Sequence, residues 1–140
     1  MNFIQSISTC MRKYVTFSGR ATRSEFWWFY LFTVLVNLVA TSQASSFVPA
    51  LFDGQDMTEN ESLYFLNNFF FLYLSTITSL ILLLPSLAVA VRRLHDIGRN
   101  GWWIFISFTV IGIIPLLIWY VTDTKDEENI YGPNPKTENA

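Results

Sequence analysis

Five arginines stand beside the apolar parts of this sequence, and their chemistry suits the binding of phosphate. A guanidinium group presents a planar fork of N–H donors that can hold two phosphate oxygens at once. We therefore predict that anionic lipid headgroups or phosphate contact Arg20, Arg23, Arg92, Arg93 and Arg99. The competing interpretation is that the arginines set membrane orientation and pair internally with Glu25 and Asp96. Arg92 and Asp96 have the i, i+4 spacing that allows an ion pair on a helix.

The adjacent residues His95 and Asp96 raise the question of catalysis. Neighbouring residues on a helix point in different directions, so this pair cannot act as an imidazole–carboxylate relay on a regular helix. The sequence places no nucleophile beside them, and one histidine with one cysteine, Cys10, on a separate segment cannot make a zinc site. We predict no catalytic residue, no metal site and no cofactor, and we expect that the protein is not an enzyme.

Three uncharged, largely apolar runs must position these residues, at 26–48, 62–91 and 102–122. The chain is 51% hydrophobic and 14% charged, whereas soluble domains average about 25% charged residues. About 20 apolar residues cross a bilayer core as a helix. The sequence predicts an all-α polytopic membrane protein, with one membrane domain over 1–140. We expect three transmembrane helices over about 26–46, 68–91 and 102–122, and a polar tail over 123–140.

The charges between the runs predict an orientation. Basic residues precede the first run, four acids (Asp53, Asp56, Glu59 and Glu61) follow it, and three arginines follow the second run. Short cytoplasmic segments carry the excess of Lys and Arg. We therefore expect a multi-pass protein with the N-terminus in the cytoplasm and the first loop outside. With three spans, the C-terminus would be periplasmic.

Local signals refine this picture. Apolar residues recur at helical spacing from Phe3 to Val15, which predicts an amphipathic N-terminal helix. That helix would lie in the headgroup plane or pack on the cytoplasmic face of the protein itself. Thr22 is the expected N-cap of the first span. Pro85 predicts a kink in the second run, which forms either one helix or two half-helices, and a bend is expected at Gly112 and Pro115.

Three motifs carry a resemblance to a known family. They are FSGRATRSEFWWF at 17–29, PSLAVAVRRLHDIGRNGWW at 85–103 and NIYGPNP at 129–135. Together they resemble the family catalogued as domain of unknown function 805, the YhaH-like small proteins of the bacterial inner membrane. The resemblance implies a location in the bacterial inner (plasma) membrane, several helical spans and no assigned activity.

The absence of Asp, Glu, Lys, Arg and His inside the three runs bears on function. Proton-coupled pumps and ion carriers usually need such groups within the membrane. We therefore predict a non-enzymatic interaction or accessory protein that contacts anionic lipid headgroups. Its expected partners are membrane lipid and either further copies of the chain or another membrane protein, with no nucleic acid. The alternative is an oligomeric channel or small-solute transporter.

Overall fold

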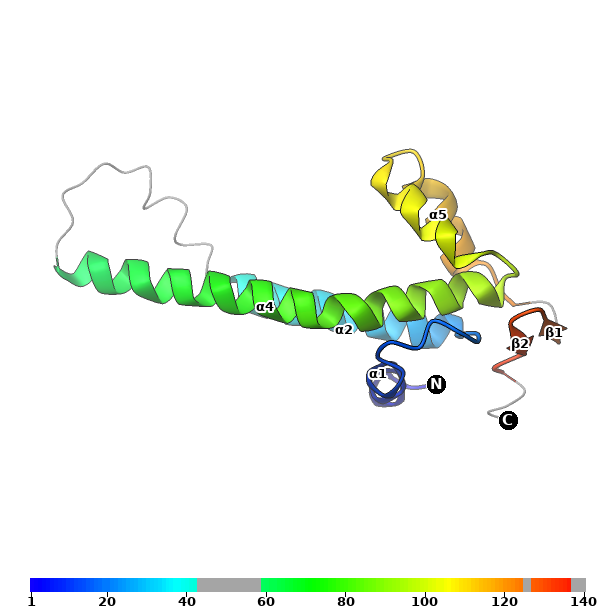
Figure 1. Ribbon diagram of the computed structural model, residues 1–140. Coiled ribbons are helices and arrows are strands. Elements are labelled where there is room, and N and C mark those ends of the chain that lie inside the picture. The colour runs from blue at the N-terminus through cyan, green and yellow to red at the C-terminus, as the bar shows by residue number, and fades with distance from the viewer. Residues whose placement is uncertain (43–58, 125–126, 137–140) are drawn as a thin grey trace. The chain divides into compact units, whose positions relative to one another are not determined.

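A computed structural model of the chain describes residues 1–42, 59–124 and 127–136. It is mostly helical (Figure 1). Its elements are the helices α1 (Phe3–Arg12), α2 (Arg23–Ser42) and α4 (Glu59–Asp96), the 3-10 helix η1 (Gly101–Phe108), the helix α5 (Ile113–Val121), and the strands β1 (Glu128–Asn129) and β2 (Gly132–Pro133). The chain divides into two units, one of residues 1–32 with 84–140 and one of residues 33–83.

Two of the described helices are long and apolar enough to cross a membrane, by length and composition. They are Arg23–Ser42 and, within α4, Phe69–Asp96. These correspond to the first two predicted spans, although residues 43–46 of the first prediction lie outside the described residues. The α4 helix is continuous through Pro85, so the second run is not broken into two half-helices. The Thr22 hydroxyl accepts a hydrogen bond from the Glu25 amide at 3.1 Å, which confirms the predicted N-cap.

The predicted third transmembrane helix over 102–122 is not confirmed. The structure divides that run into η1 and α5, joined by a turn at 109–112. Neither helix approaches the roughly 20 residues that a full span requires. Thr109 closes the turn, because the Gly112 amide donates to its carbonyl at 3.0 Å and to its hydroxyl at 3.1 Å. Pro115 lies in the first turn of α5, where a missing N–H costs little.

A short loop ends α4 and turns the chain into η1. The Gly98 and Arg99 amides donate to the carbonyls of His95 and Leu94 at 3.0 and 2.9 Å, and Gly98 has a φ of 73°. This is the double hydrogen bond of a glycine-terminated helix end. In η1, the Asn100 side chain then caps the Trp102 amide at 3.1 Å.

The C-terminal tail lies at the same end of α4 as the N-terminal loop. The Asn129 side chain donates to the His95 carbonyl at 2.9 Å, and Arg20 donates to the Gly132 carbonyl at 3.0 Å. β1 and β2 pair antiparallel beside this end of α4. Three full spans would have carried the tail to the opposite side of the membrane. The prediction of a periplasmic C-terminus is therefore not supported by the structure.

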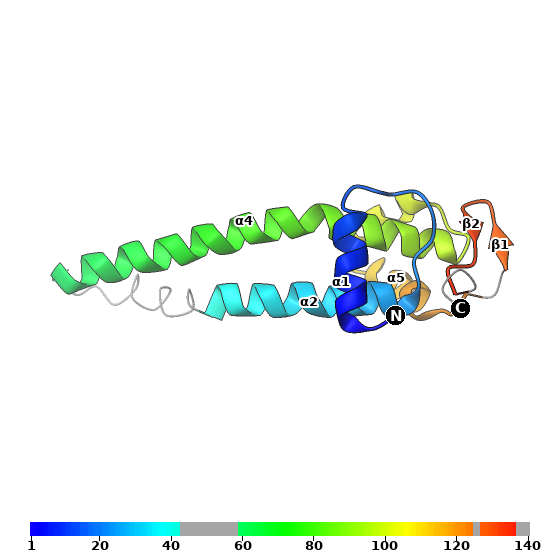
Figure 2. The ribbon, with the colours of Figure 1, turned by 90° about the horizontal axis from the view of Figure 1, so that it is seen from below.

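The N-terminal helix α1 crosses the beginning of α2 (Figure 2). Phe3 packs edge-on against Trp28, with ring centroids 5.8 Å apart. Ser6 and Cys10 are the buried positions of α1, whereas Ile4 and Met11 are exposed. The contact face is therefore narrow, and part of the apolar stripe that the sequence predicts for this helix is exposed.

Polar side chains in the unit of residues 33–83 bond to nearby backbone or between α2 and α4. The Asn37 amide donates to the Thr33 carbonyl at 2.8 Å, and Ser79 donates to Asn37 Oδ1 at 2.6 Å. The hydroxyls of Ser75 and Thr76 donate to the Leu72 carbonyl. Such groups connect helices or return to their own backbone. The alternative of a channel or transporter stays a prediction.

The turn at 109–112 provides the first test. A Cβ on Gly112 would clash with the carbonyl oxygen and side chain of Ile106. We expect Gly112→Ala to destabilise the protein by about 1–3 kcal/mol, as overpacking commonly does, and to lower the Tm in detergent. Ser107→Ala, at an exposed position of η1, is the matched control and should leave the Tm unchanged. Equal Tm values for the two variants would contradict the tight turn.

Candidate functional site

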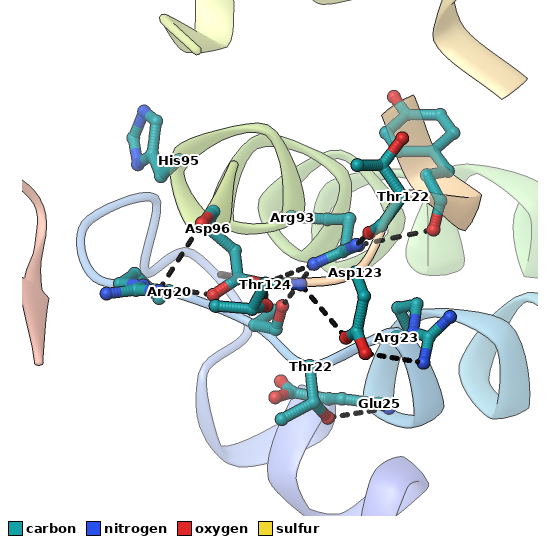
Figure 3. Close-up of polar contacts among 12 residues, drawn as sticks. Arg20, Thr22, Arg23, Glu25, Arg93, His95, Asp96, Thr122, Asp123 and Thr124 are labelled. Carbon is teal, nitrogen blue, oxygen red and sulfur yellow. Dashed lines mark hydrogen bonds and ion pairs between the residues drawn. The ribbon is translucent and has the colours of Figure 1, made fainter. Parts of the chain in front are cut away.

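The Asp96 carboxylate is the centre of a buried polar cluster that joins three segments of the chain (Figure 3). Arg20 Nε, from the N-terminal loop, donates to Asp96 Oδ1 at 2.9 Å. Arg93, one turn earlier on α4, and Thr124, at the start of the tail, both donate to Asp96 Oδ2. Three donors around one carboxylate compensate its loss of hydration.

Arg93 extends the cluster to the end of α5. Its Nε donates to the Tyr120 carbonyl at 3.2 Å, and its Nη2 donates to the Thr122 carbonyl. These carbonyls belong to the last residues of α5 and its C-cap, Thr122, where backbone acceptors lack helical partners. Arg93 therefore fixes the C-terminal end of α5 against α4.

A second buried ion pair joins α2 to α4. Arg92 Nη1 donates to Glu25 Oε1 at 2.6 Å, with both side chains almost fully buried. The Cys10 thiol of α1 lies 3.7 Å from the same oxygen. Arg92 Nε and Nη2 have no hydrogen-bond partner among the described residues. The position of Arg92 therefore depends strongly on Glu25, its one acidic partner among those residues.

The structure divides the five predicted arginines into two groups. Arg20, Arg92 and Arg93 are buried, at 6%, 1% and 0% exposure, and bind internal acids. The Arg92–Asp96 pair that the spacing allows is replaced in the structure by ion pairs of Asp96 with Arg93 and Arg20. Arg23 and Arg99 are exposed.

The exposed arginines lie beside aromatic and acidic groups. Arg99 stands over the Trp119 ring, 5.0 Å from its centroid, a distance at which a cation is attracted by the ring. Arg23 Nη2 lies 3.1 Å from Asp123 Oδ2, and Lys136 Nζ lies 2.5 Å from Asp123 Oδ1. Hydrogen bonding from Lys136 lowers the pKa of Asp123, so this acid stays charged between two cations.

A pocket of about 870 Å³ opens beside the Arg23–Asp123–Lys136 group. Arg23, Lys136 and Trp27 line it, together with polar side chains from α1 and the beginning of α2, which are Gln5, Thr9, Thr22 and Ser24. Two cations with neutral donors around a hollow offer binding partners for an anion.

His95 lies next to the Asp96 cluster and stacks on Tyr131, with ring centroids 3.8 Å apart and planes within 2°. Its Nδ1 is 3.3 Å from the Gly19 carbonyl. These contacts fix the imidazole between the N-terminal loop and the tail. Among the residues that the structure describes, no group of three or more His, Cys, Asp or Glu could hold a metal ion.

Several participants were missed by reasoning from the sequence. Thr122, at the end of the predicted third span, and Thr124 and Lys136, in the polar tail, carry no local signal of contact with residues 20–25 or 92–96. Cys10 was considered as a zinc ligand, and its contact with Glu25 was not expected. The motifs at 17–29, 85–103 and 129–135 did flag all three contributing regions, although as a resemblance and not as contacts.

The buried Arg92–Glu25 pair predicts an asymmetric mutational response. Glu25→Ala leaves a buried guanidinium unpaired, which should destabilise the protein by about 3–5 kcal/mol, whereas adding Arg92→Met to that variant should recover part of the loss. Asp123→Ala, which removes an exposed acid, should cost at most about 1 kcal/mol. Denaturation in detergent measures the free energy of unfolding of all three variants. A Glu25→Ala loss no larger than that of Asp123→Ala would contradict a buried pair.

The burial of Cys10 predicts slow chemistry at its thiol. Desolvation, reinforced by the charge of Glu25, raises its pKa to about 12, so almost no thiolate exists at pH 8. We expect alkylation by N-ethylmaleimide on the order of a hundredfold slower than in the unfolded chain. A cysteine at exposed position 8, made by Ser8→Cys with Cys10→Ser, should react at the unfolded rate. Equal rates at the two positions would show that Cys10 is accessible.

Most of the chain is similar to inner membrane proteins of Escherichia coli. Inner membrane protein YhaI of strain K12 is 35% identical over 127 residues, which cover 90% of this chain and 91% of that protein. Inner membrane protein YhaH of the same strain is 33% identical over 132 residues, covering 91% and 93%. No solved structure matches the chain. The family described as Protein of unknown function (DUF805) matches residues 14–133, which confirms the resemblance, and the chain belongs to this family.

Proposed function

We propose that this protein is a non-enzymatic accessory protein of the bacterial inner membrane that contacts anionic lipid headgroups. It acts through a membrane protein partner or as an oligomer. The observation that carries the proposal is the exposed Arg23–Asp123–Lys136 group at the 870 Å³ pocket. Here two cations share one carboxylate, so the group keeps a net positive charge that a headgroup phosphate would neutralise.

The energetics favour this group over the buried arginines as the lipid contact. Arg20, Arg92 and Arg93 are committed to Asp96 and Glu25 in a water-poor environment, where removing a partner is costly. Ion pairs between exposed side chains contribute about 0–1 kcal/mol. A phosphate can therefore replace Asp123 as the acceptor for Arg23 and Lys136 at little cost.

Arg99 supports the same contact from the end of α4. Its guanidinium stands over Trp119, and Trp103 packs edge-on against Trp119 at 5.5 Å. Tryptophan and arginine together are typical of the headgroup level of a membrane. We assign Arg99 to a general attraction for anionic lipid and assign Arg23 with Lys136 to the defined pocket.

The orientation follows from the charges. The proposed protein is multi-pass, with α2 and α4 crossing the membrane and the N-terminus in the cytoplasm. The basic residues of segments 12–23 and 92–99 support this orientation, since such residues are retained on the cytoplasmic side. The arginine-rich ends of both helices would then face the negatively charged inner leaflet.

Lipid retention tests the proposal. A hydrogen bond to a charged group contributes about 1.5 kcal/mol or more, so losing two such bonds to the phosphate in Arg23→Gln with Lys136→Gln should weaken phosphatidylglycerol binding roughly a hundredfold. Asp123→Asn should strengthen it. Native mass spectrometry of protein taken from nanodiscs containing phosphatidylglycerol and phosphatidylcholine measures the bound lipid.

A charge-matched control separates a pocket from general attraction. Arg12→Gln with Lys13→Gln removes the same charge from the end of α1, outside the residues that line the pocket. This control should retain most of the phosphatidylglycerol. The pocket proposal would be wrong if the control lost as much lipid as the Arg23/Lys136 variant, or if neither variant lost any.

A further inference from the structure

The segment from η1 to α5 leaves the end of α4 and returns to it (Figure 1). At its start, Gly101 is buried so closely on α4 that a Cβ there would lie 2.6 Å from Val91 Cγ1. At its end, Arg93 of the same helix end binds the Tyr120 and Thr122 carbonyls. Entry and exit are thus fixed to residues 91–95 of a single helix.

The lengths of the two arms match half of a bilayer. The eight residues of η1 rise about 2.0 Å each, or about 16 Å. The nine residues of α5 rise about 1.5 Å each, or about 13 Å. Since the hydrocarbon core is about 30 Å thick, both arms reach approximately its middle, and neither can cross it.

The side chains of the hairpin change from base to tip. The base carries Trp102, Trp103 and Trp119, which suit the interface. The tip carries Phe108, Val110 and Ile111, which are 83%, 84% and 82% exposed. Such large exposed apolar side chains require an apolar environment. The two apolar helices of membrane length point to a bilayer as that environment.

The backbone at the tip suits such an environment. The Thr109 amide donates to the Ile106 carbonyl at 3.0 Å, and the Thr109 hydroxyl donates to the same carbonyl at 2.8 Å. The Gly112 and Ile113 amides donate to the carbonyls of Thr109 and Val110. A turn placed in hydrocarbon needs internal acceptors for its N–H groups, and these hydrogen bonds supply them for the Thr109, Gly112 and Ile113 amides.

We propose that residues 101–121 form a re-entrant hairpin that inserts among the acyl chains of one leaflet and returns to the side from which it entered. The occupant of its apolar surface is lipid, because the lengths of the arms, the tryptophans at the base and the exposed apolar side chains at the tip all fit a single leaflet. It follows that the N-terminal loop and the tail lie on the same side of the membrane. This inference does not depend on headgroup binding.

Single cysteines in a Cys10→Ser background test the topology. Asn100→Cys marks the entrance, Val110→Cys the tip and Glu128→Cys the tail, all at exposed positions. Asp56→Cys, between the first two apolar runs of the sequence, is expected to mark the opposite side. Labelling with a membrane-impermeant maleimide is compared between intact cells and inside-out vesicles. Quenching of a bimane probe at position 110 by brominated lipids then reports contact with acyl chains.

We expect position 128 to label from the same side as position 100 and from the side opposite to position 56. Position 110 should label from neither side, and brominated lipid should quench its probe. Labelling of position 128 from the side of position 56 would overturn the hairpin in favour of a third span. Aqueous labelling of position 110, or protection without quenching because a second copy covers it, would overturn the assignment to lipid.

Discussion

The structure at the end of α4 depends on one buried carboxylate, that of Asp96. A charge removed from water is tolerated only when opposite charges and hydrogen bonds replace its hydration. Asp96 obtains this compensation from Arg20, Arg93 and Thr124, which come from three separate parts of the chain. The N-terminal loop, the last turn of α4 and the start of the tail are therefore held together by one requirement. In the same way, the neighbouring buried Glu25–Arg92 ion pair holds α2 against α4.

This arrangement separates two kinds of positive charge. Arg20, Arg92 and Arg93 fix the backbone by binding acids and carbonyl groups, including the otherwise unpaired carbonyls at the end of α5. Arg23, Arg99 and Lys136 remain at the surface. A membrane protein needs both kinds, because ionic groups in its interior must be neutralised, whereas those at its surface set orientation and attract anionic lipid. The sequence alone does not distinguish them, since all are basic residues near apolar runs.

The membrane class, the first two apolar helices and the Thr22 cap could be predicted from the sequence, because composition, run length and capping residues are local signals. The division of the third run into two short helices could not be predicted. The run at 102–122 has the right length and hydropathy, and only the hydrogen bonds of Thr109 and Gly112 reverse its direction. The partners of Asp96 could not be predicted for a related reason. Spacing along α4 allows a pair with Arg92, but tertiary packing brings in Arg20, far away in sequence.

Hydrogen–deuterium exchange of the Asp96→Asn variant measures most directly whether one carboxylate holds three segments. The Ala21 amide, bonded to the Arg92 carbonyl at 3.1 Å, and the Asn134 amide, bonded to the Glu127 carbonyl at 2.7 Å, report on the loop and the tail. We expect exchange to rise together in peptides covering 16–22 and 127–136, while the middle of α4 stays protected. An increase confined to the last turn of α4 would contradict this account, because loop and tail would then be held independently of Asp96.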